Sequence, residues 1–203
     1  MENSVFHKHV QVTHPRQGSA PLDSALCKFY DTKSRCFVFN DKTSLSFCTK
    51  EVGHVLGIKD EGNAYKYHKD GQIPGFFEIL KNEHGGESLQ LKELEVKHLK
   101  QILKDMKVDD EERKLWFKKL MSYYLVDQLL LCSSNIKYLH KGLWRVVEDL
   151  KNFDNINWAK AVHDHIHESL GVLKREIEKP GEHIFTGAAL AFEVCIAHQL
   201  FMV

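Results

Sequence analysis

The chain has 203 residues, 43% of them hydrophobic, and its 28 lysines and arginines balance 28 aspartates and glutamates. This length and apolar content predict one domain whose core needs no disulfide or metal for its stability. The neutral balance lacks the basic excess typical of dedicated nucleic-acid binders, and it argues against a nucleic-acid partner.

An N-terminal arm is the first predicted segment. Residues 1–28 are assigned to this flexible arm because their first part mixes His, Gln, Gly, Ser and Pro without periodicity. Residues 1–22 contain no apolar run of the kind found in secretory signals, and they have too few arginines for a typical transit peptide. We therefore expect a nuclear or cytoplasmic protein.

A β-hairpin is predicted next. Two strand-like runs, Cys36–Phe39 and Leu45–Cys48, flank the turn residues Asn40–Thr43. Thr49 is then predicted to cap a short helix that has an acid in its first turn and ends at Gly57.

The middle of the chain is predicted to be a surface loop followed by helices. Residues 59–88 are rich in glycine and charge, which is typical of a long loop. Apolar residues at helical spacing predict helices over residues 91–106, 109–131 and 137–150. Asp109 or Asp110 is expected to cap the second of these helices, whose C-terminal half is apolar nearly all round and should be buried.

Two further helices complete the chain. Asp154 is predicted to cap a helix over residues 155–175. One apolar face of that helix is formed by Ala159, Val162, Ile166, Leu170 and Leu173. The last helix, over residues 184–202, is the most apolar segment, but Glu193 and His198 interrupt it, so we expect a buried core helix and no membrane contact.

The predicted fold class is therefore mainly α with some β. We expect a helical bundle-like domain over residues 29–203 with one small N-terminal β-hairpin.

Three histidines on the 155–175 helix are the strongest candidates for chemistry. His163 and His167 are one turn apart, a spacing at which two imidazoles can bind one metal. The HExxH pattern of zinc peptidases is missing, because Asp164 takes the position of the glutamate. His163 is predicted at the edge of the apolar face, with His167 further toward the polar side. We expect hydrogen-bonded or solvated histidines, no metal and no cofactor, and keep a metal-dependent hydrolase as the alternative.

The five cysteines offer a second possible chemistry. Their number is odd and no CxxC pair occurs, which predicts free thiols in a reducing compartment and no zinc site. Cys195 and His198 are neighbours on one helix, but apolar surroundings should raise the pKa of that thiol and make it inert. No catalytic residue is predicted.

A family resemblance rests on the order of several motifs. They are Phe39–Phe47, Thr49–Val52, Val55–Gly57, Leu130–Cys132, Tyr138-Leu139, Asp154–Val162 and Gly187–Leu190. Over residues 29–202 the chain resembles the plant mobile domain and a related transposon-derived plant domain found next to SUMO-protease-like peptidases. Asn157-Trp158-Ala159-Lys160 is the most specific block, whereas the 59–88 insertion and the three histidines depart from the pattern. The resemblance implies a helical, often nuclear domain without catalytic residues; the peptidase part is absent here.

The functional prediction is a non-enzymatic domain of transposon origin that binds a plant protein in a regulatory or scaffold role. A groove or face around the helix Asn157–Glu168 is expected to hold the partner. The candidate interaction residues are Trp144, Trp158, His163 and His167, although both tryptophans also suit a core position. A nucleic-acid-associated protein is the second alternative, and the charge balance argues against it.

Overall fold

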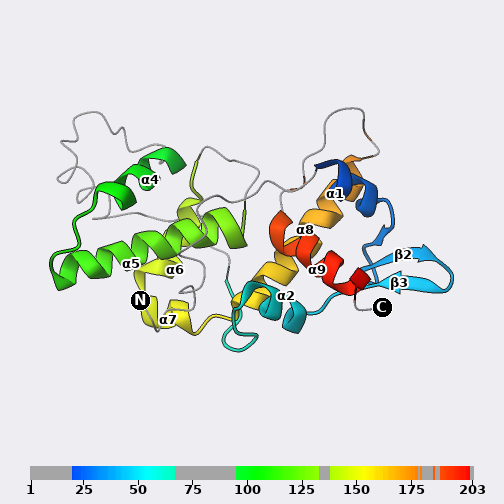
Figure 1. Ribbon diagram of the computed structural model, residues 1–203, viewed down its shortest axis with the longest axis horizontal. Helices are drawn as coiled ribbons and strands as arrows, with labels where there is room; N and C mark the ends of the chain where they lie inside the picture. Colours follow the sequence, from blue (N-terminus) through cyan, green and yellow to red (C-terminus); the bar gives the residue numbers. More distant parts are fainter. Residues whose placement is uncertain are drawn as a thin grey trace.

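A computed structural model describes residues 20–66, 95–132, 138–177, 179, 185 and 188–201 of the chain. The fold is mainly α with a small three-stranded antiparallel sheet near the N-terminus, which confirms the predicted fold class. In chain order the helices are α1 (Ala20–Cys27), α2 (Thr49–Leu56), α4 (Val96–Asp105), α5 (Glu111–Leu125), α6 (Trp144–Glu148), α7 (Leu150–Asp154), α8 (Trp158–Glu176) and α9 (Ala189–Phe201). Helices α4 to α7 gather on one side, and α1, α2, α8 and α9 gather with the sheet on the other (Figure 1).

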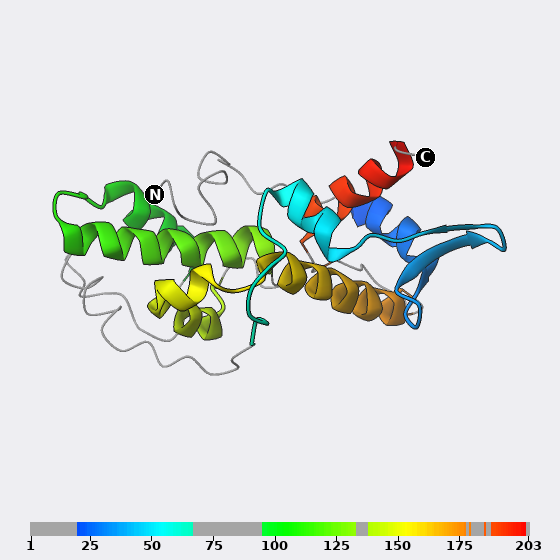
Figure 2. The same ribbon diagram turned by 90° about the horizontal axis from the view of Figure 1, so that it is seen from below.

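The sheet contains a hairpin at the predicted place and one additional strand, but the second strand of the hairpin is Thr43–Leu45 and not Leu45–Cys48, because Cys48 caps the next helix. Strands β2 (Cys36–Asn40) and β3 (Thr43–Leu45) form the hairpin, and β1 (Tyr30–Asp31) pairs with β2 on its other side. Tyr30 lies opposite Phe37, and both side chains are buried in the core. The hairpin projects beyond the helices at one end of the molecule (Figure 2).

Helix α2 begins and ends as expected, but its cap differs from the prediction. Cys48, not Thr49, is the N-cap residue, and the carboxylate of Glu51 accepts a hydrogen bond of 2.6 Å from the Cys48 N–H. Gly57 closes the helix with a φ of 63°, in the left-handed region that favours glycine.

Helix α8 is the central helix of its side of the molecule and packs against α1 and α2. All five residues of its predicted apolar face are buried. The prediction that Asp154 caps this helix is wrong, because Asp154 is the last residue of α7. Asn157 is the cap, and its side-chain oxygen accepts a hydrogen bond of 2.8 Å from the Lys160 N–H.

The other side of the molecule follows the predicted helices with two differences. Asp110 caps α5 through a 2.7 Å hydrogen bond from the Arg113 N–H. Helix α5 then continues as a π-helix, η2 (Val126–Leu130), to the point where the predicted helix ends. The segment predicted as one short helix is a 3-10 turn, η3 (Lys141–Leu143), followed by α6, and Asp149 starts the separate helix α7 by capping it.

Both ends of the described chain require corrections. The predicted arm 1–28 is too long, because residues 20–27 form α1, where Asp23 and Cys27 are buried; residues 1–19 lie outside the described residues. The last helix begins at Ala189 rather than at residue 184. Most of the predicted 59–88 loop, from residue 67 onward, also lies outside the described residues. Within the described ranges, no helix has the length and apolar character that a membrane span requires.

Candidate functional site

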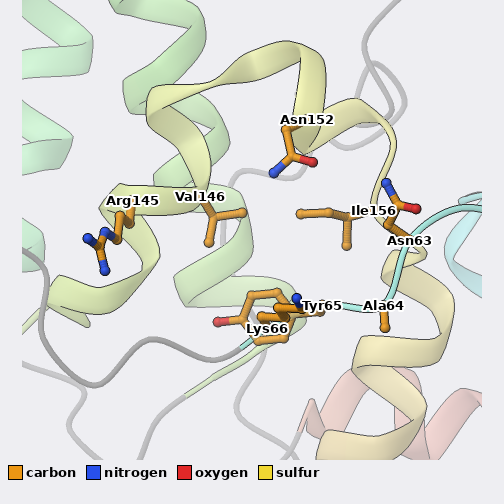
Figure 3. Close-up of a pocket in the computed structure, with 8 residues that line it drawn as sticks. All are labelled: Asn63, Ala64, Tyr65, Lys66, Arg145, Val146, Asn152 and Ile156. Carbon is orange, nitrogen blue, oxygen red and sulfur yellow. The ribbon is translucent and has the colours of Figure 1, made fainter.

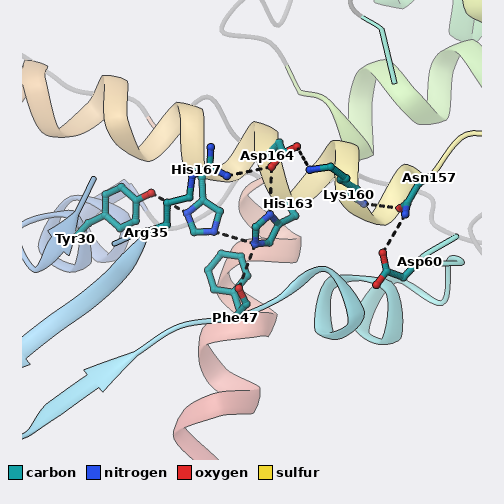
Figure 4. A network of polar contacts seen from close by, with 9 residues as sticks. All are labelled: Tyr30, Arg35, Phe47, Asp60, Asn157, Lys160, His163, Asp164 and His167. Carbon is teal, nitrogen blue, oxygen red and sulfur yellow. Dashed lines mark hydrogen bonds and ion pairs between the residues drawn. The ribbon is translucent and has the colours of Figure 1, made fainter. Parts of the chain in front are cut away.

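A chain of polar contacts runs from the buried Tyr30 to the exposed side of α8 (Figure 4). The hydroxyl of Tyr30 lies 2.7 Å from Nδ1 of His167, and Nε2 of His167 lies 3.1 Å from Nε2 of His163. Nε2 of His163 also lies 3.2 Å from the carbonyl oxygen of Phe47. Nδ1 of His163 faces a carboxylate oxygen of Asp164 at 3.5 Å. We call Tyr30, His163, Asp164 and His167 the histidine network.

The neighbours of His163 determine where the protons sit. The carbonyl oxygen of Phe47 can only accept a hydrogen bond, so Nε2 of His163 carries a hydrogen and donates it. Nε2 of His167 faces the same N–H at 3.1 Å and therefore acts as an acceptor. A neutral His167 then carries its hydrogen on Nδ1 and donates it to the Tyr30 hydroxyl.

His167 is held in its neutral form. Its side chain is buried, and its ring stacks on that of Phe47 with centroids 5.0 Å apart and an angle of 13° between the planes. Burial, together with the neighbouring His163, lowers the pKa of His167 to about 4. Burial also raises the pKa of the Tyr30 hydroxyl to about 12, so this inner contact is between two neutral groups at neutral pH.

Asp164 connects the network to the surface. Its carboxylate pairs with Lys160 at 2.7 Å and with Arg35 at 3.2 Å, and both cations are about half exposed. Partial burial alone would raise the pKa of Asp164, but the hydrogen bonds from Lys160 and Arg35 outweigh it and lower that pKa. The Arg35 pair also ties the β1–β2 turn to α8, because the two residues come from these two elements.

The network has too few ligands for a metal site. Its two imidazole nitrogens are close enough to face one ion, as the spacing in the sequence suggested. Among the residues that the structure describes, however, no group of three or more His, Cys, Asp or Glu side chains could hold a metal ion. The arrangement is that of a hydrogen-bonded histidine pair in the interior, and the metal-dependent hydrolase stays the alternative prediction.

A pocket of about 380 Å³ opens between the segment 63–66 and helices α6 and α7 (Figure 3). The pocket is lined by Asn63, Ala64, Tyr65, Lys66, Arg145, Val146, Asn152 and Ile156. No acidic residue is among these eight. Their side chains combine an apolar surface, two amides and two cations.

One wall of the pocket is held against the start of α8 by backbone pairing. The N–H of Asn63 donates to the carbonyl oxygen of Asn155 at 2.7 Å, and the N–H of Asn157 donates to that of Asn63 at 2.8 Å. Gly62 has a φ of 118°, and a Cβ there would lie 2.2 Å from the Asn155 carbonyl oxygen. Only glycine fits this close approach.

An apolar patch lies where α1 meets the sheet. Leu22, Phe29 and Val38 are 46%, 43% and 44% exposed, although all three are large hydrophobic residues. Phe29 contacts the half-buried Phe39 with ring centroids 5.1 Å apart, and its carbonyl oxygen accepts a 2.8 Å hydrogen bond from the Val38 N–H. Leu22 lies on α1, which ends at Cys27, two residues before Phe29. We call these four residues the apolar patch.

A family model described as Domain of unknown function (DUF8566) matches residues 16–192. The chain belongs to this family. No curated protein and no solved structure matches the chain. The family description names no activity, so the resemblance to the plant mobile domain stays a prediction.

In this DUF8566 domain, the Asn157–Lys160 block fixes the start of α8 through hydrogen bonds. Asn157 caps α8, and its Nδ2 donates to Asp60 at 3.1 Å. The indole N–H of Trp158 donates to the carbonyl oxygen of Phe153 at 3.0 Å inside the core. This block was the most specific part of the family resemblance, and its residue types are explained by the helix cap and the core packing that they provide.

The predicted interaction residues of the DUF8566 domain do not form a binding surface. Trp144 and Trp158 are fully buried, and His167 is 4% exposed. The prediction is wrong for these three residues because rings from other segments cover them. Trp144 packs against Trp116 and Tyr123 of α5, and Trp158 packs against Tyr65 and Phe153. His167 packs against Tyr30 and Phe47, and His163 is largely covered as well. Half of the residues of Asn157–Glu168 are buried, whereas Lys160 and Glu168 are exposed, so a partner-binding face along this helix stays a prediction.

The thiols of the DUF8566 domain are free, as predicted from their number and spacing. Burial raises the pKa of Cys195 to about 12, which agrees with the inert thiol expected at that position. Cys48 is exposed because it caps α2 at the surface.

Neither the pocket nor the apolar patch was predicted from the sequence. The pocket wall 63–66 was assigned to a loop, and no local signal places it beside Ile156, which is far away in the chain. The apolar patch did have a signal: Cys36–Phe39 is apolar on both faces of a strand, which is unusual for a hairpin with one face in water.

Proposed function

We propose that this chain is a non-enzymatic protein-binding domain that holds an acidic, apolar segment of a partner protein on the apolar patch. The observation that carries the proposal is the joint exposure of Leu22, Phe29 and Val38 at one end of the molecule. Isolated exposed apolar residues need no explanation, but Phe29 is hydrogen-bonded to Val38 and in ring contact with Phe39, and such a group of neighbours is typical of a contact surface.

Burial of the patch would provide the binding free energy. Each of the three side chains leaves close to half of its surface in water. Covering such a half-exposed residue yields roughly 1 kcal/mol. Two aromatic rings, Phe29 and Phe39, already in contact, provide a rigid anchor of the kind that dominates protein interfaces.

The charges around the patch indicate the chemistry of the partner. Lys28, Lys33 and Lys42 surround it in the chain, beside Arg35, which pairs with Asp164, whereas only Asp31 and Asp41 carry negative charge in the same stretch. A partner segment with apolar residues flanked by acids complements this surface. The resemblance to the plant mobile domain supports a transposon origin and a plant protein as the partner, in the nucleus or the cytosol.

Substitution of the patch tests the proposal. The double variant Phe29→Ser/Val38→Ser removes the apolar contact, and Leu115→Ser is the matched control because Leu115 is 47% exposed on α5, in the other group of helices. Proteins retained by the wild-type chain from plant extract are compared by quantitative mass spectrometry with those retained by each variant. Circular dichroism verifies that all three chains are folded.

The expected result is one or more proteins, with an acidic and apolar segment, that the double variant loses and the control retains. A peptide of that segment should bind the purified wild-type chain and bind the double variant at least about tenfold more weakly. Equal retention by the double variant and the wild type would contradict the proposal.

A further inference from the structure

We propose that the pocket between segment 63–66 and helices α6 and α7 binds a small organic anion with an aromatic body, such as an aryl carboxylate. This site is separate from the apolar patch, which lies at the sheet end of the molecule (Figures 1 and 3). Its volume of about 380 Å³ is in the range of ligand pockets, about 300 to 1,000 Å³.

The apolar part of the lining fits a flat ring. Val146 and Ile156 are buried residues whose side chains border the open space, and the Tyr65 ring lies on the other side (Figure 3). Tyr65 itself rests on the buried Trp158, with ring centroids 5.6 Å apart. The ring is thus supported from behind by the core, which makes it a firm surface for stacking.

The charged part of the lining selects an anion. Lys66 and Arg145 both line the pocket and no acid does. Within the described ranges, no carboxylate lies at ion-pair distance from either cation. Two positive charges in the lining, with no carboxylate partner among the described residues, favour a bound carboxylate and disfavour a bound amine.

The amides of Asn63 and Asn152 complete the polar side of the pocket. An amide can donate two hydrogen bonds and accept others, so it can fix the orientation of a carboxylate or of a ring substituent. The backbone of Asn63 is held on both sides by Asn155 and Asn157, which places this amide on a rigid wall. The site therefore combines a preformed apolar surface with a few polar groups, as small-molecule sites do.

Three probes with the same ring and different charges test the inference: 2-naphthoate, 2-naphthalenemethanol and 2-naphthylmethylammonium. Binding is followed by NMR on the methyl resonances of Val146 and Ile156, which report from inside the pocket. We expect the carboxylate to bind about tenfold more tightly than the alcohol, and the ammonium to bind most weakly.

Variants of the two cations then test whether the preference for the carboxylate probe arises at this pocket. Lys66→Gln and Arg145→Gln should each weaken 2-naphthoate binding about threefold and leave the alcohol unchanged, because each removes one exposed charge. Arg175→Gln and Lys118→Gln are the controls, since both residues are exposed and neither lines the pocket. The inference is overturned if the three probes bind equally, if the methyl resonances of Val146 and Ile156 do not move, or if the combined variant Lys66→Gln/Arg145→Gln keeps the preference for the carboxylate. These outcomes are independent of the partner-binding test at the apolar patch.

Discussion

His163 and His167 face each other through their Nε2 atoms at 3.1 Å, beneath the ring of Phe47. Only one hydrogen can occupy the space between these two nitrogens, and it already serves the Phe47 carbonyl oxygen. A proton added to Nε2 of His167 would place two N–H groups against each other in the interior. The contact therefore couples the stability of the fold to pH.

The first prediction follows from the pKa of His167, which is about 4 in the folded chain against an ordinary value of 6.5. The unfolded chain binds the proton more tightly, so the contribution of His167 to stability is full above pH 6.5. It falls as pH decreases and is lost by pH 4, a change of about 3 kcal/mol. Urea unfolding of wild type and His167→Gln between pH 4 and pH 7 measures this difference.

The difference in unfolding free energy between wild type and His167→Gln should shrink steadily over that pH range. The control is His54→Gln, because His54 is exposed. A constant difference between wild type and His167→Gln would show that His167 titrates with an ordinary pKa.

The second prediction concerns Asp23 on α1. Its pKa is raised, so its contribution to stability decreases as pH rises, the opposite of the pH dependence at His167. Burial, with the charge of Glu193 in addition, raises the pKa of Asp23 to about 7 from 3.8, and its Oδ1 has no hydrogen-bond partner among the residues that the structure describes. The folded chain binds this proton more tightly, so stability is full below pH 3.8 and decreases as pH rises through 7. The loss is about 4 kcal/mol.

Replacement Asp23→Asn keeps the shape and removes the ionisation. We expect the variant to gain stability relative to wild type as pH rises from 4 to 7.5, with most of the gain above pH 5. Glu148→Gln serves as the control because Glu148 is an exposed acid outside this region. Parallel pH curves for wild type and Asp23→Asn would refute the raised pKa.

Local sequence patterns predicted most of the helices and strands. They did not predict which side chains from elsewhere in the chain surround a given residue. The hairpin turn at Asn40–Thr43 and the stop at Gly57 depend on neighbouring residues only, and both were predicted. His167 was placed on the polar side of its helix, but Tyr30 and Phe47 come from elsewhere in the chain and cover it. A helical wheel shows only residues of the same helix, so it could not predict that His167 is covered.

The same limit explains the misplaced start of α8. Asp154 and Asn157 are both good capping residues, and helix propensity alone does not choose between them. The choice is made by long-range contacts: Asn157 bonds to Asp60 and to the backbone of Asn63, so the chain is extended there and the helix begins after it.

The third prediction uses this contact between Asn157 and Asp60. Asn157→Ala removes both the cap and the hydrogen bond of 3.1 Å to Asp60, and should cost about 1 to 3 kcal/mol of stability. Asn157→Asp keeps an oxygen for the cap but sets two carboxylates against each other. Adding Asp60→Asn to that variant reverses the roles of donor and acceptor.

Thermal or urea unfolding of wild type, Asn157→Asp, Asp60→Asn and the double variant completes the cycle. We expect the swapped pair Asn157→Asp/Asp60→Asn to recover most of the stability that Asn157→Asp loses. If the two substitutions are simply additive, the contact between the two side chains contributes nothing measurable.

The fourth prediction compares Gly62, where a side chain does not fit, with Gly171, where one does. At Gly62 the φ of 118° and the Asn155 carbonyl oxygen, 2.2 Å from the position of a Cβ, both oppose a side chain. Gly62→Ala should therefore cost at least about 1 to 3 kcal/mol, because backbone on both sides must move. Since Asn63 is the next residue, the pocket wall must move with it, and 2-naphthoate should bind more weakly.

Gly171 is the matched control for Gly62. It lies within α8, and the nearest atom to a Cβ there is an Arg175 side-chain nitrogen at 3.8 Å, an ordinary contact. Gly171→Ala should raise the unfolding free energy by about 0.5 to 1 kcal/mol, because alanine loses less conformational freedom in a helix. Urea unfolding of both variants distinguishes the two environments. A Gly62→Ala chain as stable as wild type would mean that the segment before the pocket is not held against the start of α8.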